Sequence, residues 1–279
     1  MSAAHELWRH CPTLRLDPIR IQHDSGSPIT HFARDPDGAI VVGLTARDTF
    51  WGQFAYQFSH EFGHVLALHA GDAAHKWQKS DHANQWFEES LCETASLFAL
   101  RAMAKTWTTN PPYSNWKSFA PHQREYTDKL LADPARQLPR GQSFTNWFTL
   151  AEPSLRTNAT QRLKNGLIAA QLLPLFEAEP ARWEALAWLN LGTRDPRLPF
   201  QRYLQEWRAV CPPKHRPLVE RVAALFGVPF SARKLLSRPA HRRRSEQGWA
   251  TGSEGSGPGQ AVGRVRRGGH DGRIAIHSR

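Results

Sequence analysis

The sequence is poor in the features that mark secreted and membrane-spanning proteins. It has three cysteines in 279 residues, Cys11, Cys92 and Cys211, too few and too scattered for a disulfide framework. No run approaches the roughly 20 consecutive apolar residues of a membrane-spanning helix, so we expect no membrane insertion. The first 14 residues lack the apolar stretch of about 7–15 residues that a secretory signal requires. These absences favour a cytoplasmic, reduced protein whose core is built from its 40% hydrophobic residues.

The basic charge of the sequence is concentrated in its C-terminal tail. The chain carries a net charge of +11, but residues 231–279 hold 11 Lys and Arg against 3 Asp and Glu, a net of +8. The tail also has 9 of the 19 glycines, so it cannot bury enough apolar surface to fold, and we expect disorder. Its arginine runs would bind nucleic acid only nonspecifically, through phosphates. We expect a solvated tail without a dedicated partner.

Patterning along the chain predicts an α+β fold in three parts. Residues 1–110 contain a small β-sheet followed by two long helices, residues 111–230 form a mostly helical layer, and residues 231–279 are the tail. Strands are predicted at residues 14–22, 29–34 and 39–45, as a meander or hairpin with the turn Asp35-Pro36-Asp37-Gly38 before the last strand. The sheet would offer an edge, residues 39–45 or a neighbour, to an extended peptide.

Helical spacing of apolar residues begins after the predicted sheet. Phe54, Phe58, Phe62 and Val65 recur at helical spacing, which predicts a helix over residues 50–69 with Asp48 as its N-cap. A polar loop is expected at 72–84, and a second helix at 85–106. Further helices are predicted at 122–132, 158–173, 180–191, 198–210 and 215–226.

The first long helix contains the motif His60-Glu61-Phe62-Gly63-His64. Two histidines four residues apart project from one helix face, so both imidazoles can reach one Zn²⁺ at about 2.0–2.1 Å. The intervening Glu61 lies on the neighbouring flank, where it can serve as a general base beside a metal-bound water. A chain of this composition gives roughly 0.03 accidental matches to the pattern. The motif therefore predicts a catalytic zinc site.

A third zinc ligand is expected from the next helix. A histidine or aspartate at position 70 with glycine at 67 is excluded, because both positions are alanine. The next helix offers Glu88, Glu89 and Glu93, of which Glu89 is favoured and Glu93 is the alternative. Glu89 and Glu93 share a helix face, so one can bind the metal while the other hydrogen-bonds a ligating histidine. Cys92 is interpreted as a small buried residue.

These motifs resemble the gluzincin metallopeptidases, which belong to the zincins. The run from His60 to Leu66, with Ala95-Ser96-Leu97-Phe98-Ala99 downstream, also resembles the compact ImmA/IrrE-type branch, and the resemblance covers residues 28–105. It implies a zincin-like core over residues 1–110, in which the sheet packs on the active-site helix pair. It also implies zinc ligands His60, His64 and Glu89, Glu61 as the base, and Glu93 as the carboxylate that supports the ligands.

The sequence therefore favours a zinc-dependent hydrolase, most simply a metallopeptidase acting on peptides or proteins. The alternative is a zincin-like regulatory or binding module with little or no turnover. Tyr113, His122 and Tyr126 are nominal oxyanion stabilisers, and the sequence does not choose among them. The other histidines, including His75, His82, His122 and His215, are expected at the surface.

Overall fold

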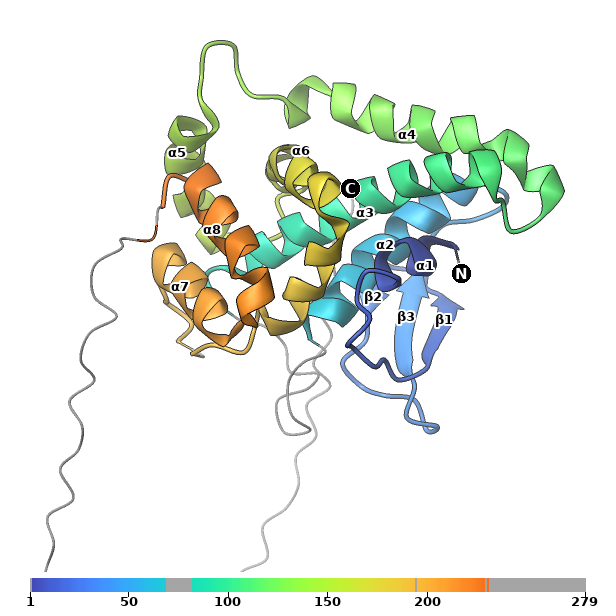
Figure 1. Ribbon diagram of the computed structural model, residues 1–279, viewed down its shortest axis with the longest axis horizontal. Helices are drawn as coiled ribbons and strands as arrows, with labels where there is room; N and C mark the ends of the chain where they lie inside the picture. Colours follow the sequence, from blue (N-terminus) through green and yellow to red (C-terminus); the bar gives the residue numbers. More distant parts are fainter. Residues whose placement is uncertain (1, 69–81, 194, 229, 231–279) are drawn as a thin grey trace, which may run out of the picture. The chain divides into compact units, whose positions relative to one another are not determined.

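The computed structural model describes residues 2–68, 82–193, 195–228 and 230 (Figure 1). Its described part has the α+β fold expected from the sequence, with a small sheet followed by helices. None of the described helices is long and apolar enough to cross a bilayer. The tail at 231–279, His75 and most of the expected loop at 72–84 lie outside the described residues.

The sheet has the strand order β1-β3-β2, with β1 at Ile19–His23, β2 at Ile29–Thr30 and β3 at Ile40–Leu44. β2 and β3 are antiparallel, as a hairpin requires, but β1 pairs parallel to β3, so the meander is not formed. β3 is buried along its whole length because it is the central strand. Residues 40–44 therefore cannot offer a free edge, and the edges belong to β1 and β2. The turn before β3 is as expected, with Gly38 at φ +82°.

Two long helices, α2 at Trp51–Ala67 and α3 at Gln85–Thr109, form the centre of the molecule. Asp48 is not the N-cap of α2: the helix starts after Phe50 without a side-chain cap, and Asp48 has a positive φ of 56°. The helices approach closely where Gly63 faces Cys92. A Cβ atom at position 63 would lie 2.9 Å from Cys92 Sγ and 3.0 Å from its Cα, so this crossing requires glycine.

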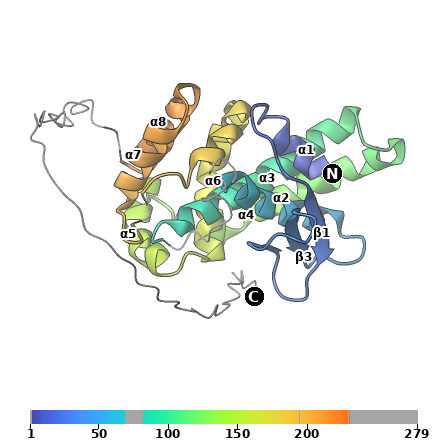
Figure 2. The ribbon, with the colours of Figure 1, turned by 90° about the horizontal axis from the view of Figure 1, so that it is seen from below.

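The remaining helices cover the central pair. They are α1 at Ser2–Trp8, α4 at Ala120–Ala132, α5 at Phe144–Thr157, α6 at Arg162–Ala178, α7 at Phe200–Val210 and α8 at Arg216–Leu225. Sequence analysis missed α1 and α5, and residues 180–188 form a 3₁₀ helix instead of an α-helix. Figure 2 shows the sheet and the α7–α8 pair on opposite sides of α2 and α3.

Aromatic packing ties the C-terminal helices to α3. Trp86 and Phe87, in the first turn of α3, contact Phe200 of α7 at ring-centroid distances of 4.8 and 5.2 Å, and both contact Phe226 just after α8. All four rings are buried in one hydrophobic cluster that also includes residues of α1, α2 and β3. The first turn of α3 is thus held by packing against Phe200 of α7 and Phe226, within a cluster that also includes α1, α2 and β3.

The expectation that His215 lies at the surface is wrong. The residue is 2% exposed, because Glu184 accepts a hydrogen bond from its Nε2 at 3.0 Å and the Trp188 ring covers it. Burial lowers the pKa of His215 below its ordinary value of 6.5, and the hydrogen bond to Glu184 only partly opposes this. The folded state therefore favours the neutral imidazole.

Acidification should destabilise the protein through His215. Because the pKa is lower in the folded than in the unfolded chain, the stability that His215 contributes is present above about pH 6.5 and is lost as the pH falls through the folded pKa. We expect the free energy of unfolding to fall by at most about 1.4 kcal/mol per pH unit from this group. Urea unfolding at several pH values would measure the slope, and His215→Gln should reduce it. An unchanged slope in the variant would contradict this account.

Candidate metal centre

The two motif histidines lie side by side on α2. The ring centroids of His60 and His64 are 5.2 Å apart, and both side chains are largely buried between α2 and α3. Each Nε2 atom is buried and has no hydrogen-bond partner in the structure. Buried ring nitrogens without hydrogen-bond partners are costly, so these two atoms are candidate metal donors.

Glu89 of α3 lies against both of these nitrogens. Its Oε2 is 3.4 Å from His60 Nε2, and its Oε1 is 3.8 Å from His64 Nε2. Donor atoms about 2.0–2.1 Å from a tetrahedral zinc ion are separated from one another by about 3.3–3.4 Å. Glu89 Oε1 is itself buried without a hydrogen-bond partner. Glu89 therefore places a different carboxylate oxygen near each Nε2 atom, at separations close to those between zinc ligands.

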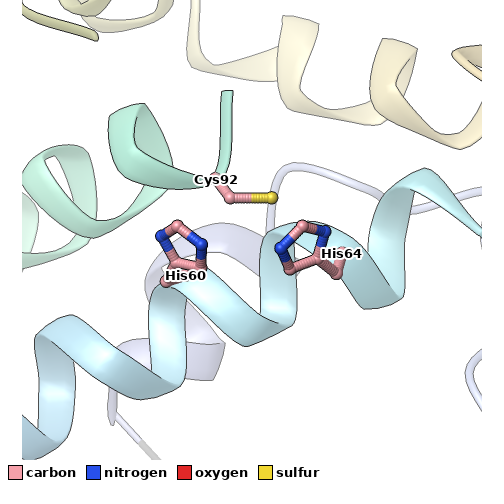
Figure 3. Close-up of side chains that lie close together, drawn as sticks. All are labelled: His60, His64 and Cys92. Atoms are coloured by element: carbon pink, nitrogen blue, oxygen red, sulfur yellow. The ribbon is translucent and has the colours of Figure 1, made fainter. Parts of the chain in front are cut away.

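Cys92 forms a second possible donor set with the same histidines. Figure 3 shows its side chain beside the two imidazoles, and one donor atom from each of the three residues lies within 4.8 Å of the others. Its Sγ also fills the space at the close crossing with Gly63. Burial, followed by the neighbouring carboxylates, raises the pKa of the thiol well above its ordinary value. In the metal-free chain the thiol is thus protonated and packed, whereas a bound cation would favour the thiolate, the metal-binding form of cysteine.

The Nδ1 atom of His64 is held by a chain of hydrogen bonds from α7. Glu88 Oε1 lies 2.7 Å from His64 Nδ1, and Asn190 Nδ2 donates to Glu88 Oε2 at 2.7 Å. Asn190 Oδ1 in turn accepts from the Tyr203 hydroxyl at 2.9 Å. Such contacts fix the orientation of a histidine and aim its Nε2. Sequence analysis offered Glu88 only as a candidate ligand and did not assign Asn190 or Tyr203 to the site, because these two carry no local motif.

The Nδ1 atom of His60 faces Glu93, one turn beyond Glu89. Glu93 Oε2 is 3.6 Å from this atom, while Glu93 Oε1 accepts hydrogen bonds from Tyr56 and Arg136. Burial alone would raise the pKa of Glu93, but the hydrogen bond with His60 and the charge of Arg136 lower it to about 2. Glu93 is therefore an ionised carboxylate behind His60, and Glu89 is the carboxylate that contacts both Nε2 atoms.

The neighbouring carboxylates shift the pKa values of His60 and His64. Burial opposes protonation of both rings, yet Glu89 and Glu93 raise the pKa of His60 to about 10. The charge of Glu89 and the hydrogen bond that His64 donates to Glu88 likewise raise the pKa of His64. Without a cation between them, protons must balance the carboxylates. In the metal-free chain the cluster therefore favours protonated imidazoles beside these carboxylates.

Gly166 of α6 allows Arg136 to reach Glu93. A Cβ atom at position 166 would lie 2.9 Å from Arg136 Cζ, and Arg136 is only 4% exposed. We expect Gly166→Ala to push the guanidinium from Glu93 and to destabilise the fold by about 1–3 kcal/mol, measured by urea unfolding. In an Arg136→Ala background the same substitution should be neutral or stabilising by up to about 1 kcal/mol. If Gly166→Ala lowered the free energy of unfolding equally in both backgrounds, the contact with Arg136 would not be the cause of the destabilisation.

Glu61 is held by a contact with Thr30 of β2. The Thr30 hydroxyl lies 3.0 Å from both Glu61 Oε2 and its backbone oxygen, whereas Oε1 has no hydrogen-bond partner. Burial raises the pKa of Glu61, against the charges of His64 and His60. A buried carboxylate with one oxygen fixed and one available is suited to take up and return a proton.

A cavity of about 160 Å³ lies over these groups. Glu61, His60 and Glu89 line it from the helix pair, and Tyr126, Arg162 and Asn165 line it from the helical layer. Of the three nominal oxyanion stabilisers only Tyr126 reaches this cavity, since Tyr113 and His122 are exposed elsewhere. Comparisons with family models, curated proteins and solved structures find no match to this chain.

Proposed function

We propose that this chain is a zinc-dependent peptidase of the gluzincin type, with His60, His64 and Glu89 as metal ligands and Glu61 as the general base. One observation carries the proposal: two buried imidazole nitrogens without hydrogen-bond partners each lie within 3.8 Å of an oxygen of the buried Glu89 carboxylate. A purely structural role for the histidines leaves these atoms unsatisfied, at a cost of about 1–3 kcal/mol each.

The residues around the metal have separate tasks in this proposal. When bound, zinc would polarise the scissile carbonyl and make water more acidic. Glu61 would then take a proton from the attacking water at Oε1 and return it to the leaving amine, while Thr30 holds Oε2. Glu88 and Glu93 would fix the rings of His64 and His60 from their Nδ1 sides.

The sheet suggests how a peptide would reach the site. Thr30 belongs to the edge strand β2 and contacts Glu61, and Pro28, just before this strand, lines the cavity. An extended peptide running along this edge would bring its backbone to the carboxylate that acts as the base. The sheet and the α2–α3 pair would together form a zincin-like core.

Metal content and cleavage would test the proposal together. The purified full-length chain should contain about one zinc per molecule by elemental analysis, and it should cleave members of a broad peptide library. Zinc without any cleavage would point to the regulatory or binding module. Absence of zinc binding, even after incubation with excess zinc, would contradict the proposal.

A further inference from the structure

Arg162 is placed where it can meet a substrate in the cavity. It is the first residue of α6 and lines the same cavity as His60, Glu61 and Glu89. It makes no ion pair with any carboxylate in the described ranges. By contrast Arg136, another arginine close to the site, is buried and donates hydrogen bonds to Glu93 and Tyr56. Arg162 is exposed and thus brings an unpaired positive charge to a cavity that Glu61, Glu89 and Glu93 also line.

A buried asparagine fixes the position of Arg162. Asn165, one helical turn later on the same face, donates through Nδ2 to the Trp86 carbonyl at 3.0 Å and to Ser90 Oγ at 3.2 Å. Both acceptors lie on α3, and Ser90 directly follows Glu89. This anchor holds the first turn of α6 at the level of Glu89. Asn165 also lines the cavity and is 4% exposed, with its Oδ1 lacking a hydrogen-bond partner.

The size of the cavity limits what Arg162 can bind together with the reacting group. A volume of about 160 Å³ is close to the roughly 150 Å³ of a cavity that holds benzene. Because this cavity is small, a group bound by Arg162 and a carbonyl near Glu61 fit it best when they belong to the same or adjacent residues of a peptide. The planar guanidinium matches a carboxylate with two parallel hydrogen bonds.

We propose that Arg162 binds a carboxylate of the substrate, so that the site selects peptides with an acidic group beside the scissile bond. The carboxylate can come from the C-terminus of the peptide or from an Asp or Glu side chain. This inference rests on the proposed function and names its substrate class. Arg162 is a specificity-determining residue in this scheme, and Asn165 is a positioning residue that acts through the placement of α6.

Matched peptides would test the selection. A library is prepared in three forms: with free C-termini, with amidated C-termini, and with Asn and Gln in place of Asp and Glu. The zinc-loaded full chain should cleave the acidic forms with a kcat/KM at least about tenfold higher than the neutral forms. Which neutral form loses cleavage identifies the source of the carboxylate. Arg162→Gln should abolish the preference, chiefly by raising KM for the acidic peptides.

Binding provides a readout that does not depend on turnover. The zinc-loaded Glu61→Gln variant should retain acidic peptides in affinity selection, and adding Arg162→Gln should remove this preference. Arg202→Gln is the matched control, because Arg202 is an exposed arginine on α7 that contacts Gln205 and does not line the cavity. Arg162→Lys should retain part of the preference, because lysine keeps the positive charge but lacks the planar guanidinium that donates two parallel hydrogen bonds.

The outcomes separate the two proposals. Arg162-dependent binding of acidic peptides with no cleavage by the wild-type chain would preserve the inference and overturn the peptidase assignment. Equal treatment of acidic and neutral peptides, whether they are cleaved or only bound, would overturn the inference. If Arg162→Gln and Arg202→Gln reduced the preference for acidic peptides equally, the inference would also be overturned.

Discussion

Glu61→Gln should reduce peptide hydrolysis by about 10²- to 10⁴-fold while leaving the zinc content unchanged. The amide has nearly the shape of the carboxylate and can still bond to Thr30, but it cannot take up a proton at Oε1. Because Thr30 holds the Glu61 side chain, the amide should keep its place and the ligand geometry should persist. Single-turnover kinetics and elemental analysis of the same preparation would measure both quantities.

Thr30→Val is the companion variant. It removes the hydroxyl that holds Glu61 Oε2 but keeps the carboxylate, so activity should fall less than in Glu61→Gln. The two substitutions together should cost little more than Glu61→Gln alone, because Thr30 acts through Glu61. Hydrolysis at the wild-type rate by zinc-loaded Glu61→Gln would rule out the proposed mechanism.

The second large effect concerns the third metal ligand. Zinc at about 1,000 times its dissociation constant should stabilise the wild-type chain by about 4.1 kcal/mol, because the folded state binds the metal and the unfolded chain does not. Glu89→Gln replaces a charged ligand by a neutral one of the same shape and should abolish most of this gain. Thermal unfolding with and without zinc, together with the zinc stoichiometry, would measure the difference.

Cys92→Ala is the matched control for the thiol donor set. The substitution removes a buried sulfur, so it should destabilise the metal-free chain through the cavity it leaves. The stabilisation gained on adding zinc should nevertheless remain near the wild-type value. If Cys92→Ala lost the zinc-dependent gain and Glu89→Gln kept it, the ligand set would be His60, His64 and Cys92.

Local patterns predicted the central helices and the turn before β3. The spacing of Phe54, Phe58 and Phe62 reports burial on one face, and the observed α2 buries Phe58 and Phe62. Breaker residues likewise indicated the end of α3, which runs to Thr109 and stops before Asn110. Such signals are local in sequence, so they need no knowledge of the packing.

Features that depend on distant segments were not predicted. The parallel pairing of β1 with β3 and the burial of His215 are decided by contacts between residues far apart in sequence. At the candidate site the motif identified His60, Glu61 and His64, but it could not assign Arg136, Asn190 or Tyr203, which come from the helical layer. Nothing in the spacing of those residues connects them with α2 before the chain is folded.

Because all three thiols are buried, their reaction with a thiol reagent reports local opening of the folded chain. Cys11, Cys92 and Cys211 are each buried, and burial is the main cause that raises their pKa values, to about 12 for Cys11 and Cys211. A thiol-reactive dye can therefore label Cys92 only when α2 and α3 separate at Gly63. The labelling rate of Cys92 would measure how often α2 and α3 separate transiently. A bound cation bridging the two helices would slow this labelling.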